Sequence, residues 1–414
     1  MAALRQRVVR GIGCGCVVAL TAACSGTIPS MSALPAGAGA ALGTLAKAVA
    51  ERPSLGDTEE QRMAQENGRK FEAENEMWND PLLEAYVTAV VQRIVAVAKP
   101  RPFAYRMRIV KSPSINAFTF GGGLLYVNAG LLGRVDNEAQ LAMVLAHEIA
   151  HVTERHVPKG IETAYGLQVA AQLATQAAPS APLPADALQK AYDYAMNAAV
   201  NGHGRRQETE ADEVGLDYMT RAGYDPRESP HTFEVLLKEY GDSSAIKNFF
   251  WENHPTNTAR IERTTWLVKD KYGAAAAGRQ PVVDTDEFRQ RTRGVVVALG
   301  LLDYNQKRFD GARAMFEKAA RVDAADARPH YYLGKIALDT GVGRDAIDGA
   351  IAHLVSATAA NPLYAPAYRE LGLAYSRQGD TAKAVAALTR YVTLAPNSDD
   401  AGQIHNAIRQ LQRQ

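Results

Sequence analysis

The stretch LAMVLAHEIAHVTERH, residues 141–156, decides the fold of this chain. It contains an HExxH pattern, in which His147 and His151 lie four positions apart and therefore share one face of a helix. Both imidazoles can reach one zinc ion from that face, and Glu148 is placed to take a proton from water at the metal. Apolar residues flank the pattern, so these polar side chains occupy buried positions where they need partners. The stretch predicts a zinc-binding helix over residues 139–152.

A catalytic zinc ion needs a third protein ligand that leaves its fourth position open. The acidic stretch RRQETEAD, residues 205–212, supplies Glu208 as the candidate. Asp212 lies four residues further along the same helix face, where it is expected to orient a ligand histidine. Glu210 points elsewhere on that helix and is expected to be solvated. Two other histidines, His156 and His203, are alternative ligands, although each is expected to lie at the surface or behind the ligands.

Composition limits the kind of protein and the kind of metal site. The chain has 414 residues, enough for two or three domains, and its 47% hydrophobic and 22% charged residues exclude a wholly disordered chain. Lys and Arg number 46 against 45 Asp and Glu, a formal net charge of +1, which gives no electrostatic reason to expect nucleic-acid binding. The 3 cysteines all lie at or before Cys24, so a metal in the body of the protein must be held by histidines and carboxylates.

The N-terminus has the pattern of an export signal. Three arginines without an acid precede the apolar stretch GIGCGCVVALTAA, residues 11–23, which is too short to span a membrane. The end of this stretch and the next residue, LTAAC (20–24), resemble a bacterial lipobox, so we expect a signal peptide over residues 1–23 and lipidation of Cys24. Residues 24–56, rich in Gly, Ala, Ser and Pro, are expected to form a flexible tether. The expected location is the periplasmic face of the outer membrane. An ordinary signal peptide with an incidental cysteine is the alternative, and would give a soluble periplasmic protein.

The patterns around the zinc helix predict a mixed domain. Asp-Pro opens a predicted helix over residues 80–98, and residues 103–110 alternate like a half-buried strand. Residues 115–128 predict two short strands about the glycine turn at 121–123. Residues 57–270 are therefore expected to form an α+β zincin-type metallopeptidase domain, mostly helical with a small sheet.

The last third of the chain is repetitive. Leu-Gly pairs begin at Leu299, Leu333 and Leu371, and the first spacing of 34 residues is the tetratricopeptide period. After a linker at residues 271–284, this period predicts an all-α tetratricopeptide solenoid of about three repeats over residues 285–414. Such arrays are binding surfaces, so a protein partner is expected there.

Several motifs together resemble the HtpX and CAAX prenyl protease family of gluzincin metallopeptidases. They are INAF (115–118), HEIAHVTERH (147–156), RRQETEAD (205–212), AGYDP (222–226) and NHP (253–255). The resemblance covers about residues 57–270. Since the transmembrane helices of that family are missing and repeats follow, the chain is most similar to the soluble envelope branch of BepA-type proteases. Arg260, shortly after the NHP motif, is expected to form a structural salt bridge.

The resemblance implies roles for two further regions. It implies that Leu124, Leu125, Tyr126 and Val127 form a sheet edge, to which an extended peptide substrate adds through main-chain hydrogen bonds. The alternative is an ordinary hairpin in the core. It also implies that His254 lies near the metal, where it either stabilises the oxyanion or occupies the fourth zinc position and holds the enzyme latent.

Motifs and resemblance together predict a zinc-dependent endopeptidase with one catalytic Zn²⁺, in which Glu148 is the general base. The resemblance implies that it hydrolyses misfolded or stalled envelope proteins, and that the repeats dock substrates or partners. The alternative is a chaperone or scaffold for outer-membrane protein assembly with a latent zinc site. A purely structural zinc fold is disfavoured because it leaves Glu148 without a role. The lipid anchor is the only membrane contact expected.

Overall fold

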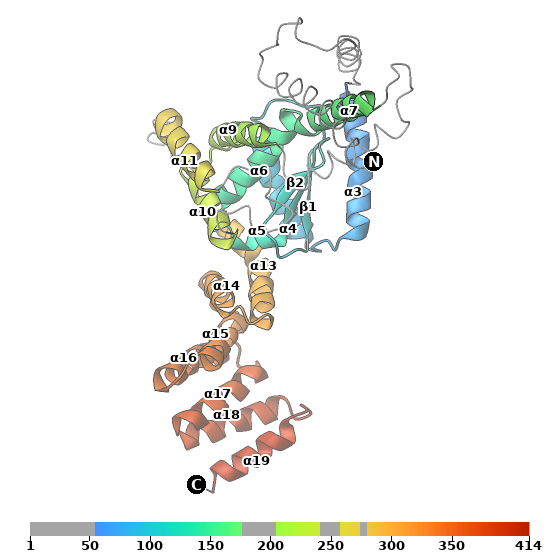
Figure 1. Cartoon of the computed structure of the whole chain (residues 1–414). Coiled ribbons are helices and arrows are strands. Elements are labelled where there is room, and N and C mark those ends of the chain that lie inside the picture. Colours follow the sequence, from blue (N-terminus) through green and yellow to red (C-terminus); the bar gives the residue numbers. More distant parts are fainter. Residues whose placement is uncertain (1–53, 176–203, 241–256, 274–279, 414) are drawn as a thin grey trace, which may run out of the picture.

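The computed structural model describes residues 54–175, 204–240, 257–273 and 280–413, and Figure 1 shows their arrangement. A mostly helical domain with a small sheet is followed by an array of helices that extends away from it to the C-terminus (Figure 1). This architecture confirms the predicted fold class. Three predicted functional residues lie outside the described ranges, namely Cys24, His203 and His254. Within the described ranges, no helix has both the length and the apolar character needed to cross a membrane.

The elements of the N-terminal domain are α3 (Asp57–Glu74), α4 (Pro81–Val95), β1 (Arg106–Val110), β2 (Ala117–Thr119), β3 (Leu124–Asn128), α5 (Ala129–Arg134), α6 (Glu138–Thr153), α7 (His156–Thr175), α9 (Arg205–Arg221), α10 (Glu228–Tyr240), α11 (Asn257–Leu267) and the π-helix η2 (Val268–Tyr272). The elements of the array are α13 (Asp286–Asn305), α14 (Phe309–Val322), α15 (Ala327–Thr340), α16 (Arg344–Ala360), α17 (Ala365–Gln378), α18 (Thr381–Leu394) and α19 (Ala401–Leu411).

The three strands lie in the order β1-β3-β2, with β1 parallel and β2 antiparallel to β3. The prediction that Leu124, Leu125, Tyr126 and Val127 form a free sheet edge is therefore wrong, because β3 is the central strand and both of its hydrogen-bonding sides are occupied. The glycine turn at residues 121–123, whose three residues all have positive φ, folds the chain from β2 directly back along β3. Because β1 pairs with the other side of β3, β3 is enclosed and β2 takes an outer position.

Helix α6 contains the HExxH pattern and runs through the core of the domain. The Asn137 side chain caps it by accepting a hydrogen bond from the backbone N–H of Gln140 at 2.9 Å. All of its residues except Val144 are buried, as expected for a helix that is covered on every side. Helix α9 packs so closely against α6 that a Cβ on Gly215 would lie 2.9 Å from the backbone nitrogen of His147. This close approach brings the acidic residues of α9 to the histidines of α6.

The first repeat helix belongs to the core of the N-terminal domain. Phe288, Val295 and Leu299 of α13 lie in the same buried cluster as the apolar residues of α4, α5 and α6. The Lys318 ammonium of α14 donates hydrogen bonds to two backbone carbonyls at the end of α5, at 2.6 and 3.0 Å. The segment predicted as a linker, residues 271–284, thus leads into a helix packed on the core of the N-terminal domain.

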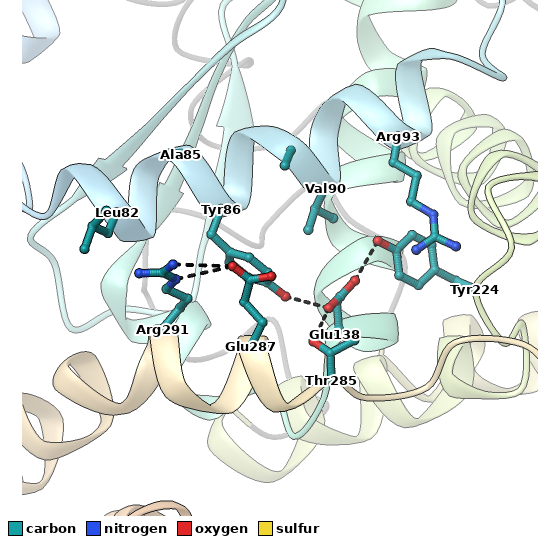
Figure 2. Close-up of a pocket in the computed structure, with 11 residues that line it drawn as sticks. Leu82, Ala85, Tyr86, Val90, Arg93, Glu138, Tyr224, Thr285, Glu287 and Arg291 are labelled. Carbon is teal, nitrogen blue, oxygen red and sulfur yellow. Dashed lines mark hydrogen bonds and ion pairs between the residues drawn. The ribbon is translucent and has the colours of Figure 1, made fainter.

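A pocket of about 440 Å³ lies at this junction, between α4 and α13 (Figure 2). The buried carboxylate of Glu138, the first residue of α6, lies among its lining residues. It accepts hydrogen bonds from the Tyr86 hydroxyl at 2.6 Å, from the Tyr224 hydroxyl at 2.9 Å and from the Thr285 hydroxyl (Figure 2). Because Thr285 is the N-cap of α13, these bonds connect the beginning of the array to the beginning of α6.

The array consists of the helix pairs α13–α14, α15–α16 and α17–α18, followed by α19 (Figure 1). Glycines allow the helices of each pair to approach closely. A Cβ on Gly300, Gly334 or Gly372 would lie 2.9, 2.7 or 2.6 Å from a side chain of the partner helix. These are the glycines of the three Leu-Gly pairs, so the period in the sequence corresponds to the repeated packing of the array.

Candidate metal centre

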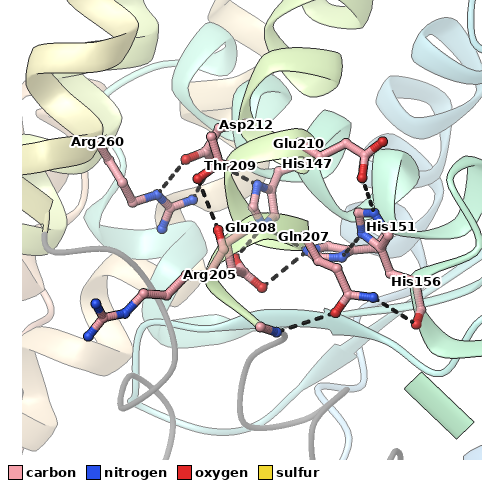
Figure 3. A network of polar contacts seen from close by, with 11 residues as sticks. His147, His151, His156, Arg205, Gln207, Glu208, Thr209, Glu210, Asp212 and Arg260 are labelled. Atoms are coloured by element: carbon pink, nitrogen blue, oxygen red, sulfur yellow. Dashed lines mark hydrogen bonds and ion pairs between the residues drawn. The ribbon is translucent and has the colours of Figure 1, made fainter. Parts of the chain in front are cut away.

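Helices α6 and α9 bring together His147, His151 and Glu208, which are buried and whose ligand atoms all lie within 4.8 Å of one another (Figure 3). His147 Nε2 and His151 Nε2 are 3.0 Å apart. The Glu208 carboxylate oxygens lie 3.3 Å from His147 Nε2 and 3.6 Å from His151 Nε2. The three side chains named as ligands from the sequence therefore converge, with the Nε2 atoms of both rings facing the carboxylate.

The donors and the charges of the cluster fit a divalent cation. Two imidazole nitrogens and a carboxylate form a donor set of catalytic zinc sites. Glu148, Glu208 and Asp212 are all buried, and the buried Arg260 guanidinium lies close enough to influence them. With neutral histidines, three carboxylates and one guanidinium leave two negative charges uncompensated, and a divalent cation would balance them.

This excess of negative charge is reflected in two pKa values. Burial by itself lowers the pKa of His147, but its hydrogen bonds with Asp212 and Glu208 raise it to about 10. Burial raises the pKa of Glu148 to about 7, with a further upward contribution from Glu208 and an opposing one from His147. A proton and a metal ion therefore compete for the same negatively charged site.

A buried ion pair orients His147. Its Nδ1 lies 2.9 Å from a carboxylate oxygen of Asp212, and Arg260 donates hydrogen bonds to both oxygens of that carboxylate, at 2.6 and 2.9 Å (Figure 3). The guanidinium also lies over the ring of Phe233, 4.0 Å from its centroid. Burial raises the pKa of Asp212, but Arg260 and His147 together hold it below its ordinary value. Asp212 thus lies where a residue that orients His147 should lie, and Arg260 in turn holds Asp212.

Residues 81–266 match the model of peptidase family M48. The chain carries an M48 peptidase domain. A tetratricopeptide repeat model matches residues 367–398, within the helical array. The combination confirms the predicted metallopeptidase with C-terminal tetratricopeptide repeats.

Relatives of the M48 domain are proteases in bacteria and mitochondria. The beta-barrel assembly-enhancing protease of Escherichia coli (strain K12) is 27% identical over 378 residues, which cover 83% of this chain and 74% of that protein. A putative beta-barrel assembly-enhancing protease of Vibrio cholerae is 35% identical over 170 residues, covering 39% of this chain and 34% of that protein. The mitochondrial metalloendopeptidase OMA1 of Schizosaccharomyces pombe is 29% identical over 215 residues, covering 50% of this chain and 61% of that protein. At 83% of this chain, the first match extends beyond the peptidase domain into the array.

In this M48 domain a third histidine lies behind His151. His156, the first residue of α7, is fully buried, and its Nδ1 lies 2.8 Å from Nδ1 of His151. It faces the side of the His151 ring away from Nε2, so it stands outside the cluster of three ligands, although the sequence left it as an alternative. Glu210, expected to be solvated, has a side chain that is 41% exposed but places a carboxylate oxygen 3.2 Å from His156 Nε2 (Figure 3). Burial lowers the pKa of His156, against an upward contribution from Glu210.

Proposed function

We propose that this protein is a zinc endopeptidase of the bacterial cell envelope that hydrolyses misfolded or stalled envelope proteins. The buried convergence of His147, His151 and Glu208 in an M48 domain, with Glu148 beside them, carries this proposal. The name of the Escherichia coli relative, which matches across peptidase domain and array, supports a task in the assembly of β-barrel proteins. The export-signal pattern and Cys24 support a lipoprotein that faces the periplasm from the outer membrane.

The chain's own residues supply acid–base chemistry and ligand orientation. Zinc held by the three ligands would polarise the scissile carbonyl and the attacking water. Glu148 accepts a proton from that water and then donates it to the leaving amine. Such a role is favoured by a carboxyl group that holds a proton readily, and burial raises the pKa of Glu148 above its ordinary value. Asp212 holds the His147 ring by its Nδ1, so that Nε2 stays directed toward the other ligands.

Strand β2 offers the sheet edge for an extended substrate. It ends the sheet and lies next to α6, so a peptide that pairs with its main chain would pass beside the metal ligands. The buried Glu60 of α3 holds the adjoining turn, accepting hydrogen bonds from the Gly122 N–H at 3.0 Å and from Arg101 at 2.6 Å. Main-chain pairing tolerates many side chains, which suits an enzyme that acts on unfolded proteins of varied sequence.

The tetratricopeptide array would recruit a protein partner or the substrate itself. Because α13 shares the core of the peptidase domain, a protein bound to the array is held at a fixed position relative to α6. We place the partner among the proteins that assemble the outer membrane, in line with the relatives' names.

A cleavage assay on an unfolded β-barrel outer-membrane protein tests the enzymatic proposal. We expect the wild type to cleave it and Glu148→Gln to lose cleavage while its zinc content is unchanged. Glu213→Gln is the matched control, since Glu213 carries the same charge on α9 but pairs with Arg263 at the surface. Equal cleavage by wild type and Glu148→Gln would exclude Glu148 as the base. Zinc-loaded wild type that cleaves nothing would favour the scaffold alternative.

Fractionation tests the location. We expect the wild type in the outer-membrane fraction and Cys24→Ser outside it. A wild-type protein found only among soluble proteins would exclude the lipid anchor.

A further inference from the structure

The two ligand histidines differ in what lies behind them. Nδ1 of His147 faces the Asp212 carboxylate, whereas Nδ1 of His151 faces another imidazole, that of His156. The rings of His151 and His156 meet edge to face, at 71° with centroids 4.8 Å apart. At 2.8 Å the two Nδ1 atoms share one proton, so that one nitrogen donates and the other accepts.

The direction of this hydrogen bond follows from the ligand role of His151. Its Nε2 faces His147 and Glu208, and a ring that binds a metal through Nε2 carries its proton on Nδ1. His151 Nδ1–H therefore donates to Nδ1 of His156. A neutral imidazole that accepts at Nδ1 carries its own proton on Nε2, and His156 Nε2 lies 3.2 Å from a carboxylate oxygen of Glu210.

We propose that His156 and Glu210 form a relay that fixes the tautomer and the orientation of His151 for metal binding. This inference rests on the proposed zinc site and adds two positioning residues to it. Glu210 accepts from His156, His156 accepts from His151, and the bond from His151 leaves its Nε2 lone pair directed at the metal. The acceptor behind His151 also makes that ring a stronger donor to the metal.

The backbone places His156 for this contact through an unusual residue. Arg155, between the end of α6 and the beginning of α7, has φ of 61°, in the left-handed region that residues other than glycine rarely adopt. This conformation lets α7 begin at once, with His156 turned back toward His151. Helix α9 completes the arrangement, because the Gln207 side chain donates to the His156 carbonyl at 3.4 Å while Glu210 reaches the ring (Figure 3). Strained backbone of this kind is found at functional sites, where the surrounding structure maintains it.

The two relays also differ in exposure. Asp212 and Arg260 behind His147 are buried, whereas the Glu210 side chain behind His156 is 41% exposed. Solvent screens the charge of Glu210, so His156 is expected to contribute more to metal binding than Glu210 does.

The tautomers can be read directly from the zinc-loaded full-length protein. Long-range ¹H–¹⁵N correlation on histidine-labelled protein, with His156 assigned from its loss in His156→Asn, reports which ring nitrogens carry protons. We expect the proton of His151 on Nδ1 and that of His156 on Nε2. A proton on Nδ1 of His156 would overturn the relay.

Zinc affinity, measured by competition with a chelator, tests the effect of the relay on metal binding. Replacing an outer partner of a ligand histidine typically weakens metal binding by about 10–100-fold, and we expect this for His156→Leu. His156→Asn keeps an acceptor near the Nδ1 position and should bind within a few-fold of wild type. Glu210→Gln should weaken binding by less than His156→Leu, and the control Glu213→Gln should leave it unchanged.

The outcomes separate the relay from the metal centre. A wild type that binds no zinc would overturn both. Wild type, His156→Leu and Glu210→Gln with the same zinc affinity would overturn the relay and leave the metal centre standing. If His156→Leu does not fold, the tautomers still decide the question.

Discussion

Replacing Arg260 by methionine removes a buried cation from a site with three buried carboxylates. Arg260 is 5% exposed and donates two hydrogen bonds to Asp212, which is 1% exposed. Methionine keeps an unbranched apolar side chain, so the main change is the loss of the guanidinium, which pairs with Asp212 and lies over the Phe233 ring. Breaking a buried ion pair from one side costs about 3–5 kcal/mol, because the other charge stays buried without its partner. We expect the free energy of unfolding of the zinc-free protein to fall by that amount.

Zinc should recover part of this loss, because its two positive charges compensate the Asp212 carboxylate, which in Arg260→Met keeps its contact with His147 but loses the guanidinium. Denaturant unfolding of wild type and variant, with chelator and with zinc, measures both effects. The matched control is Arg263→Met, three residues along α11, which removes an exposed ion pair with Glu213 that is worth about 0–1 kcal/mol. Equal losses in the two variants would refute the reasoning, as would a loss in Arg260→Met that zinc does not change.

Other predictions concern the junction and the array. Burial lowers the pKa of Lys318 to about 8 from its ordinary 10.5. Between pH 8 and 10.5 this side chain is therefore more protonated in the unfolded than in the folded protein, so the free energy of unfolding rises with pH in that range. The difference in unfolding free energy between wild type and Lys318→Met should therefore grow by up to ~3 kcal/mol from pH 8 to 10.5, and a constant difference would contradict this. Thr285→Val removes both the cap of α13 and the bond to Glu138, and should lower stability by about 1–2 kcal/mol in denaturant unfolding. Gly334→Ala should destabilise the array by about 1–3 kcal/mol, because its Cβ would lie 2.7 Å from a side chain. Gly349→Ala should instead stabilise the protein and raise its melting temperature, because the added Cβ has no neighbour within 4 Å and alanine favours a helix more than glycine does.

Local spacing made the catalytic helix predictable. His147 and His151 share a face because they lie four residues apart, and the apolar residues around them mark a helix covered on all sides. Glu208 could be named because a zinc site built on two histidines needs a third donor. The Leu-Gly pairs of the array were equally informative, since each glycine lies where two helices approach closely.

The order of the strands is not encoded in such local patterns. The LLYV stretch at residues 124–127 is apolar throughout, and a central strand and a covered edge strand share that pattern. The turn at residues 121–123 pairs β2 with one side of β3, and β1 on the other side then encloses β3. The sequence shows the glycines of the turn. It does not show that β1 lies on the side of β3 opposite β2.

The relay behind His151 depends on a backbone conformation that the sequence does not announce. Arginine is not a residue that favours positive φ, so nothing at Arg155 signals that α7 begins immediately and returns His156 to the core. Glu210 looks like part of an ordinary charged helix face, because the sequence does not show that His156 lies next to it. The only hint in the sequence was a histidine five residues after His151, in the pattern HExxHxxxxH. Its role becomes clear once the conformation of Arg155 is known.

Zinc content per chain tests the metal centre most directly. The full-length protein is purified, dialysed against metal-free buffer and analysed by mass spectrometry for bound zinc, as wild type, Glu208→Ala and Glu213→Ala. Since Glu208 completes the donor set with His147 and His151, we predict one zinc per chain in wild type and Glu213→Ala, and loss of zinc from Glu208→Ala. Full zinc occupancy in Glu208→Ala, or none in the wild type, would contradict the assignment.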